Sequence, residues 1–156
     1  GELIGMLQEN SDEPYAAEIA AKVTEWKRKK RPIHTTIDFK DVIEEALVFV
    51  PVKDRKEAVK KSCQRCFQAL RIDVNSEFEV LYSFMDSLPE VLAPGARVAI
   101  LTFHSGEDRL VKKALKQGKK QGIYSDISEE VTRPSAEECN RNPRARSTKL
   151  RWAIRA

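Results

Sequence analysis

A cluster of polar side chains follows a short apolar run in the second half of this sequence of 156 residues. The run from Val98 to Phe103 leads into His104, Ser105 and, three residues later, Asp108. An imidazole changes protonation near neutral pH, while a hydroxyl and a carboxylate beside it offer hydrogen bonds to a polar substrate. In open α/β sheets, ligands bind outside the carboxyl ends of the strands. The sequence therefore places a candidate catalytic group, His104, Ser105 and Asp108, at the end of this run.

Structural roles compete with catalytic ones at these positions. His104 either contacts a substrate or hydrogen-bonds neighbouring backbone and orders the turn, and both interpretations stay open. Ser105 and Asp108 have the spacing of a capping pair, which favours Ser105 as a helix cap over a nucleophile. Glu107 and Asp108 are then most simply explained as first-turn acids that complement the helix dipole.

Two further groups of polar residues stand apart from this cluster. Gln68, Arg71 and Asn75 are three and four residues apart, so they share one face of a continuous helix. They either satisfy backbone groups where two parts of the fold join or contact a ligand. The segment from residue 140 to 156 has no acidic residue and contains Arg141, Arg144, Arg146, Lys149, Arg151 and Arg155. Such a segment favours a polyanionic partner, with a solvated loop as the alternative.

Hydrophobic patterning predicts the elements that position the cluster. The near-continuous apolar run 98–103 is typical of a strand buried on both faces in a parallel sheet. A helix is expected from about Gly106, so strand, turn and helix make half of a βαβ unit. A short strand is predicted over 130–133, and alternating apolar residues over 150–154 predict a half-buried final strand. The predicted fold class is α/β.

The first part of the sequence is expected to be helical. Apolar residues recur at helical spacing in four segments, which run over about residues 12–31, 35–50, 54–72 and 76–92. We therefore divide the chain into a helical region, 1–72, and an α/β region, 73–156. Two or three strands are too few to close the core of a parallel sheet. The α/β region thus has the character of the back half of a larger domain, and we expect the isolated chain to be marginally stable.

Composition indicates the compartment in which the protein is expected and the classes of protein that are excluded. The formal charge is +4, with 41% hydrophobic and 33% charged residues, and no apolar stretch approaches the length of a membrane span. Three cysteines without a partner pair indicate a reducing compartment, and with no signal peptide we expect a cytoplasmic protein without a membrane partner. Cys63 and Cys66 form a CxxC, but they fall on the apolar side of a predicted helix. We expect them to be buried, and we expect no metal site.

Three motifs occur in order along the chain. They are FQALRI-x-VN-x-E from Phe67, FHS-x-EDR-x-VK from Phe103, and NPR-x-RS-x-KLR from Asn142, with a Pro94-Gly95 turn between the first two. Together they resemble the family of S-adenosylmethionine-dependent methyltransferases that modify the N4 amine of a cytosine in small-subunit ribosomal RNA. The early segments EPYAAEIA and RPIHTT are similar to the helical insert of that family. The resemblance covers the chain from about Leu3 onward.

The resemblance implies a fold and partners. Residues 73–156 would be the C-terminal half of a Rossmann-like class I methyltransferase domain, and residues 1–72 its substrate-recognition insert. S-adenosyl-L-methionine would be the cofactor and ribosomal RNA of the small ribosomal subunit the partner, with a homodimer as one assembly to test. In a eukaryotic source the compartment would be a plastid or mitochondrion. The residues that would contact RNA are Gln68, Arg71, Asn75, Arg109, Arg144, Arg146 and Lys149.

The implied reaction gives His104 a specific role. The lone pair of a cytosine N4 amine is delocalised into the ring, so the amine is a poor nucleophile. An acceptor that takes one amine hydrogen would localise the lone pair and help to remove the proton. The base must also leave its stack to reach a pocket. His104 stands where such an acceptor is expected.

The sequence departs from the family pattern in three places. None of its six glycines makes a GxG turn after a strand, so the cofactor loop and the acidic residue that would hold the ribose are not found, and we expect poor cofactor binding by this chain alone. Gly106 stands where the family usually has leucine, and Lys61-Ser62 where it often has histidine-proline. The alternatives are a non-catalytic RNA-binding or assembly module and a helical protein-interaction module.

Overall fold

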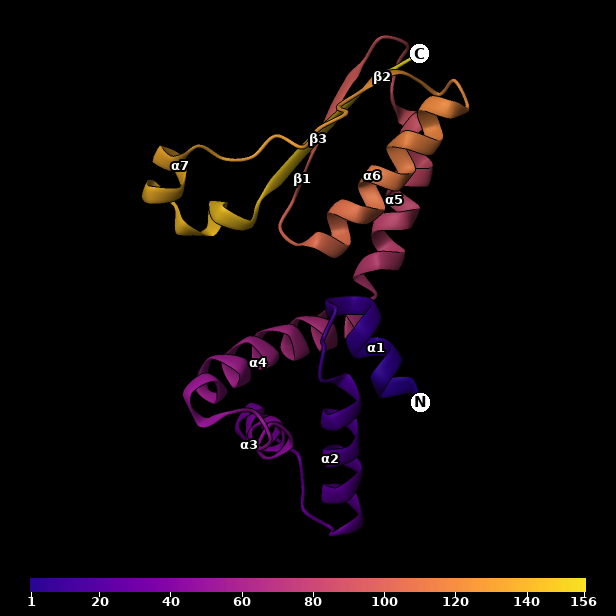
Figure 1. The fold of residues 1–156 in the computed structure, drawn as a ribbon. Helices are drawn as coiled ribbons and strands as arrows, with labels where there is room; N and C mark the ends of the chain where they lie inside the picture. The colour runs from indigo at the N-terminus through magenta and orange to yellow at the C-terminus, as the bar shows by residue number, and fades with distance from the viewer. The chain divides into compact units, whose positions relative to one another are not determined.

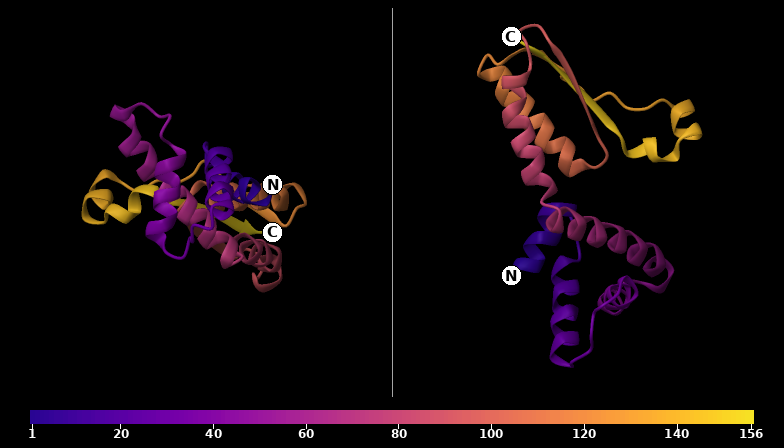
Figure 2. Two further views of the ribbon diagram at one scale, coloured as in Figure 1. Left: turned by 90° about the horizontal axis from the view of Figure 1, so that it is seen from below. Right: turned by 180° about the vertical axis from the view of Figure 1, so that it is seen from behind.

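The computed structural model describes all of residues 1–156 and divides them into two compact units, Gly1–Glu77 and Phe78–Ala156. Both units are drawn in Figures 1 and 2. The chain is mixed α/β, mostly helical with one small sheet. None of its helices has the length and apolar character needed to cross a membrane. The assignment of residues 1–72 and 73–156 to an insert and a half domain stays a prediction.

The first unit is built from helices alone. These are α1 (Glu2–Ser11), α2 (Ala16–Arg28), α3 (Thr36–Ala46) and α4 (Val52–Val74). The capping signal at Thr35 is confirmed, since its hydroxyl accepts a hydrogen bond from the Asp38 N–H at 3.1 Å and the Asp38 carboxylate accepts from the Thr35 N–H at 2.8 Å. Helix α1 was not predicted. The predicted helix start near residue 12 corresponds to α2.

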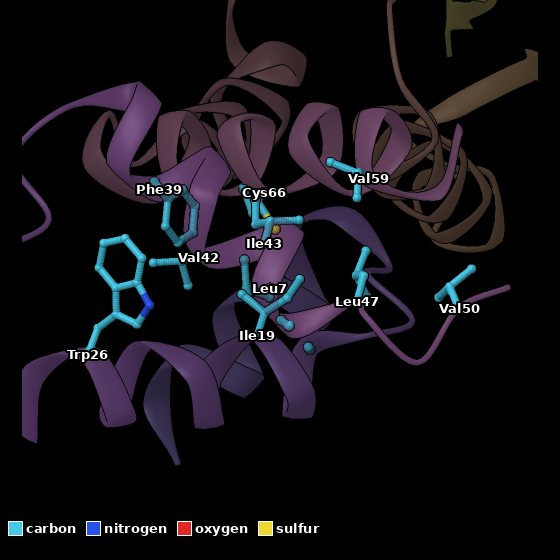
Figure 3. Packing of buried hydrophobic residues seen from close by; sticks show 13 residues of the cluster. Leu7, Ile19, Trp26, Phe39, Val42, Ile43, Leu47, Val50, Val59 and Cys66 are labelled. Atoms are coloured by element: carbon cyan, nitrogen blue, oxygen red, sulfur yellow. The ribbon is translucent and has the colours of Figure 1, made fainter. Parts of the chain in front are cut away.

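The core of the first unit collects one apolar face from each helix. Leu7, Ile19, Ile43 and Cys66 come from α1, α2, α3 and α4 in turn, and all four are fully buried. Figure 3 shows these side chains pointing toward one another. Each helix is amphipathic and covers its apolar stripe against the others. The expectation that Cys66 is a buried apolar residue is confirmed.

The second unit contains the sheet, with strands β1 (Arg97–Thr102), β2 (Tyr124–Ile127) and β3 (Lys149–Arg155) in the order β1-β3-β2. Both pairings are antiparallel, with Ala99 opposite Trp152 in the first. The prediction of a parallel sheet was wrong for these strands. Exposed and half-buried residues alternate along β1, so the strand is not buried on both faces either. The half-buried final strand is confirmed as β3.

Two helices cover one face of the sheet. Helices α5 (Glu77–Val91) and α6 (Ser105–Lys120) lie side by side on it (Figures 1 and 2). Met85 and Leu88 of α5 pack with Val111 and Leu115 of α6 in the core of this unit. Proline at residue 89 lies inside the last turn of α5, which continues to Val91. The other face exposes large apolar side chains, including Leu101 and Trp152.

The segment between β2 and β3 differs from the prediction. No strand forms over 130–133, where Thr132 makes only an isolated bridge to Leu150. The strand forms instead at Tyr124–Ile127, where the polar residues Ser125 and Asp126 interrupt the apolar pattern by which a strand is predicted. A short helix, α7 (Ala136–Arg141), and a 3-10 helix, η1 (Pro143–Ser147), follow and lead into β3.

Candidate functional site

The turn between β1 and α6 carries the predicted catalytic residues. His104, not Ser105, is the N-cap of α6, and its Nδ1 accepts a hydrogen bond from the Glu107 N–H at 3.4 Å. The His104 backbone is extended, with φ −141° and ψ 167°, which turns its side chain back over the first helical turn. Ser105 is the first helical residue and is exposed. The prediction of Ser105 as the cap was therefore wrong, because an imidazole nitrogen fills that role.

Glu107 completes the turn and was considered from the sequence only as a dipole-complementing acid. One of its carboxylate oxygens, Oε2, accepts from the Phe103 N–H at 2.9 Å, and the other lies 3.4 Å from His104 Nε2. Because Nδ1 acts as an acceptor, a neutral imidazole carries its hydrogen on Nε2, toward this carboxylate. The structure therefore shows His104 in the role of ordering the turn.

Asp108 is held inside the protein by a residue from another strand. Its two carboxylate oxygens accept from Arg151 Nε at 2.7 Å and Arg151 Nη2 at 3.2 Å, and both side chains are buried. Burial alone would raise the pKa of Asp108, but the hydrogen bonds and charge of Arg151 outweigh it and the pKa is lowered. This pair ties the first turn of α6 to β3. Asp108 is thereby positioned as an anchor rather than as a group open to a ligand.

Several of the predicted basic residues gather at the same end of the sheet. Lys149 lies opposite Thr102, the last residue of β1, and its Nζ is 3.9 Å from Asp108. Arg144 and Arg146 lie on η1, directly before β3, and both are exposed. Arg109 is exposed on α6. The end of β1, the start of α6 and the start of β3 thus form one polar and basic surface.

The remaining predicted RNA contacts lie on α4 in the first unit. Arg71 is exposed and pairs with Glu77 through two hydrogen bonds, at 2.9 and 3.2 Å. Asn75 is the exposed C-cap residue of α4, and Gln68 is half-buried. They share one helix, as predicted, but they are not a buried polar trio.

Cys63 and Cys66 do not have the character of reactive thiols. All three cysteines are free, and burial raises the pKa of Cys63 and, to about 12, that of Cys66. A thiol with such a pKa is a poor metal ligand and a poor nucleophile, because both roles need the thiolate. Cys66 belongs to the core of the first unit.

The residues present do not form a complete site for S-adenosylmethionine. Only β1 runs directly into a helix, and its turn lacks a pair of glycines through which backbone could approach a nucleotide. The space beside Gly106 is also filled, since a Cβ there would lie 2.7 Å from Cζ of Phe78.

Arg151 is the site residue that the sequence reasoning missed. It was counted only as part of the basic segment. The alternation of Leu150, Trp152 and Ile154 predicts that these apolar residues face the core, but this was wrong, since β3 buries Arg151 and Ala153 and exposes Trp152. A charged residue on the core face of a strand needs a buried partner, and Asp108 supplies it, but the apolar pattern gave no signal that Arg151 would face inward.

The fold and the site together define a class: a mixed α/β protein with a separate helical unit and a polar, basic surface where a strand gives way to a helix. Comparison with known proteins narrows the class. The chain matches the family described as the MraW methylase family over residues 1–156, so it belongs to that family.

Individual relatives carry more specific names. The chain is 63% identical over 155 residues to ribosomal RNA small subunit methyltransferase H 1 of Lachnoclostridium phytofermentans and 64% identical to the protein of that name from Agathobacter rectalis. The similarity covers 99% of this chain but 42% and 44% of those proteins. Ribosomal RNA small subunit methyltransferase H of Dictyoglomus turgidum is 38% identical, over 96% of this chain and 47% of that protein. The chain thus spans about half the length of these relatives.

Proposed function

We propose that the chain is the C-terminal portion of an S-adenosylmethionine-dependent methyltransferase that acts on N4 of a cytosine in small-subunit ribosomal RNA. The observation that carries the proposal is the match to the family along the whole chain, with relatives at 63% and 64% identity that are named for this class of activity. In this proposal the second unit is the back half of a Rossmann-like domain. The first unit belongs to the substrate-recognition insert.

Within the proposed enzyme, the turn after β1 borders the base. His104 would accept a hydrogen from the N4 amine and so localise its lone pair. Because Nε2 carries the hydrogen and stays 3.4 Å from Glu107, the accepting nitrogen would be Nδ1, which would have to exchange its bond from the Glu107 N–H for one from the amine. Glu107 would then keep the imidazole in place. Ser105 and Arg109, both exposed beside it, would contact the nucleotide. Asp108 would hold the turn in position through its hydrogen bond from Arg151.

The basic surface gives the RNA a place to bind. Arg144, Arg146 and Lys149 supply positive charge beside the turn, which favours phosphate contacts without base specificity. Gln68, Arg71 and Asn75 would add contacts from α4. S-adenosylmethionine would supply the methyl group, held mainly by parts of the enzyme outside this chain.

The test uses the complete protein and small ribosomal subunits that lack the methyl mark. We expect His104→Ala to reduce methyl transfer from labelled S-adenosylmethionine by about 100-fold, the scale of a general acid or base, while RNA affinity changes little. Ser83→Ala, at an exposed position of α5, is the control and should keep full activity. Methyl transfer that is absent even from the unaltered protein, with RNA binding intact, would overturn the enzyme proposal in favour of an RNA-binding module.

A further inference from the structure

A groove lies between α3 and α4 in the first unit. Its volume is about 1390 Å³. Val48 and Val52, 60% and 81% exposed, lie on its lining together with Val59, Cys63 and Phe67. Aliphatic side chains this exposed in a concave surface are typical of binding grooves.

The acidic residues that line the groove are already paired. Glu44 pairs with Lys40 at 2.8 Å, Glu45 with Arg31 at 3.0 Å and Glu57 with Lys61 at 3.6 Å. Glu45 also accepts a hydrogen bond from the Trp26 indole N–H at 3.0 Å. The negative charge of the lining is therefore compensated from within the unit.

The basic residues on the α4 side are not compensated. Lys53, Lys56 and Lys60 are exposed, line the groove and form no ion pair. They are spaced three and four residues apart, so they make one row along α4. Arg55 adds a further positive charge beside them, and its guanidinium donates to the backbone carbonyls of Val48 and Val50. The groove thus combines an apolar lining with a row of free positive charge.

We propose that this groove binds an amphipathic, acidic helix of a protein partner. Apolar side chains at helical spacing would cover Val48, Val52 and Phe67, as in other complexes in which a helix lies in a groove. Acidic side chains beside that stripe, three and four residues apart, would face Lys53, Lys56 and Lys60. The proposal is independent of the methyltransferase assignment.

A nucleic acid fits the groove less well. A single strand needs an aromatic face for stacking, and Phe67 is half-buried with its ring packed against Phe39 at a centroid distance of 5.8 Å. The remaining apolar surface is aliphatic.

The experiment measures fluorescence anisotropy of a labelled peptide titrated with the full chain. The probe is a helical peptide of about 18 residues with leucines on one face and glutamates beside them. We expect binding in the micromolar range, weakened at least tenfold by the combined variant Lys53→Gln, Lys56→Gln, Lys60→Gln and also by high salt. Val52→Ser should weaken binding without affecting the fold, because this side chain is 81% exposed.

The chain contains a matched control for the charge change. Lys113, Lys116 and Lys120 on α6 have the same spacing and exposure, and replacing all three with glutamine removes the same charge. This control should change the affinity less than twofold, and a peptide with lysine in place of glutamate should not bind. No anisotropy change at about 100 µM protein, or equal loss in the control, would overturn the proposal. So would a single-stranded RNA that binds with the same dependence on Lys53, Lys56 and Lys60.

Discussion

The buried pair of Asp108 and Arg151 shows how single residues fix the geometry of the site. Asp108 stands in the first turn of α6 and Arg151 on β3, so their two hydrogen bonds hold the helix start against the strand. Removing one member of such a pair leaves a buried charge without a partner, which is more costly than losing an exposed ion pair. The position of His104, four residues earlier, depends on this anchor.

We expect Asp108→Asn to destabilise the second unit by about 3 kcal/mol at pH 7. The pKa of Asp108 is lowered in the folded protein, so its contribution to stability is complete above the unfolded pKa of about 4 and is lost as the pH falls through the lower folded pKa. The difference from the unaltered protein should therefore shrink below pH 4 in thermal unfolding followed by circular dichroism. Asp126→Asn, which breaks the exposed pair with Lys119, is the control and should cost less than 1 kcal/mol. Equal effects of the two variants at pH 7 would contradict the anchor role.

Cys66 offers a second residue-level prediction. Burial raises the pKa of its thiol to about 12, so almost none of it is ionised at pH 8. Iodoacetamide should therefore modify Cys139, which is only half-buried, before Cys66. Mass spectrometry of the peptides would show the order, and addition of urea should remove it. Rapid modification of Cys66 in the folded chain would contradict its place in the core.

At the scale of elements, two glycines in helices differ in the space around them, which is filled at one and open at the other. A Cβ on Gly118 of α6 would lie 2.6 Å from the ring of Tyr124, which is buried, whereas a Cβ on Gly5 of α1 would meet nothing within 4 Å. Gly118 is therefore required where α6 crosses β2. Gly5 only weakens the helix in which it stands.

We expect the two alanine substitutions to have opposite signs. Gly118→Ala should destabilise the chain by about 1–3 kcal/mol, because the ring of Tyr124 must shift. Gly5→Ala should stabilise it by about 0.5–1 kcal/mol through helix propensity. Urea unfolding of both variants checks the signs. Stabilisation by Gly118→Ala would show that the packing of α6 on β2 is looser than described.

Local signals explain which elements could be predicted. The capping box at Thr35 and the alternation over Leu150 to Ile154 depend on neighbours in the sequence, and both elements form where they were expected. The direction of β1 in the sheet depends on its partner, β3, about fifty residues away, so an apolar run could not reveal an antiparallel pairing. The same holds for the site. The residue types at 104–108 indicated a polar turn before a helix, but they did not indicate that His104 would be the N-cap.

At the scale of the whole molecule, the chain has two separate cores. One collects Leu47 and its neighbours in the first unit, and the other collects Leu115 and its neighbours in the second. The second unit also exposes Leu101, Phe103 and Trp152, and β1 is an edge strand. These features support the expectation that the isolated chain is marginally stable.

We expect each core to respond only to its own substitutions. Leu47→Ala should cost about 2–5 kcal/mol and speed amide hydrogen exchange within residues 1–77, while Leu115→Ala should do the same within residues 78–156. Hydrogen exchange followed by mass spectrometry separates the two. Faster exchange in both units from either substitution would mean that the chain unfolds as one cooperative body.

The order of strands in the sheet has a consequence for how the protein is made. Strand β3 is the central strand, and β1 and β2 have no other partner. During translation, β1 and β2 leave the ribosome before residues 149–155 do, so neither can make its pairing with β3 until that strand has emerged. The helices of the first unit depend on contacts within residues 1–77 and are free to assemble earlier. We therefore expect the first unit to fold ahead of the second, which can complete its sheet only after β3 has been made.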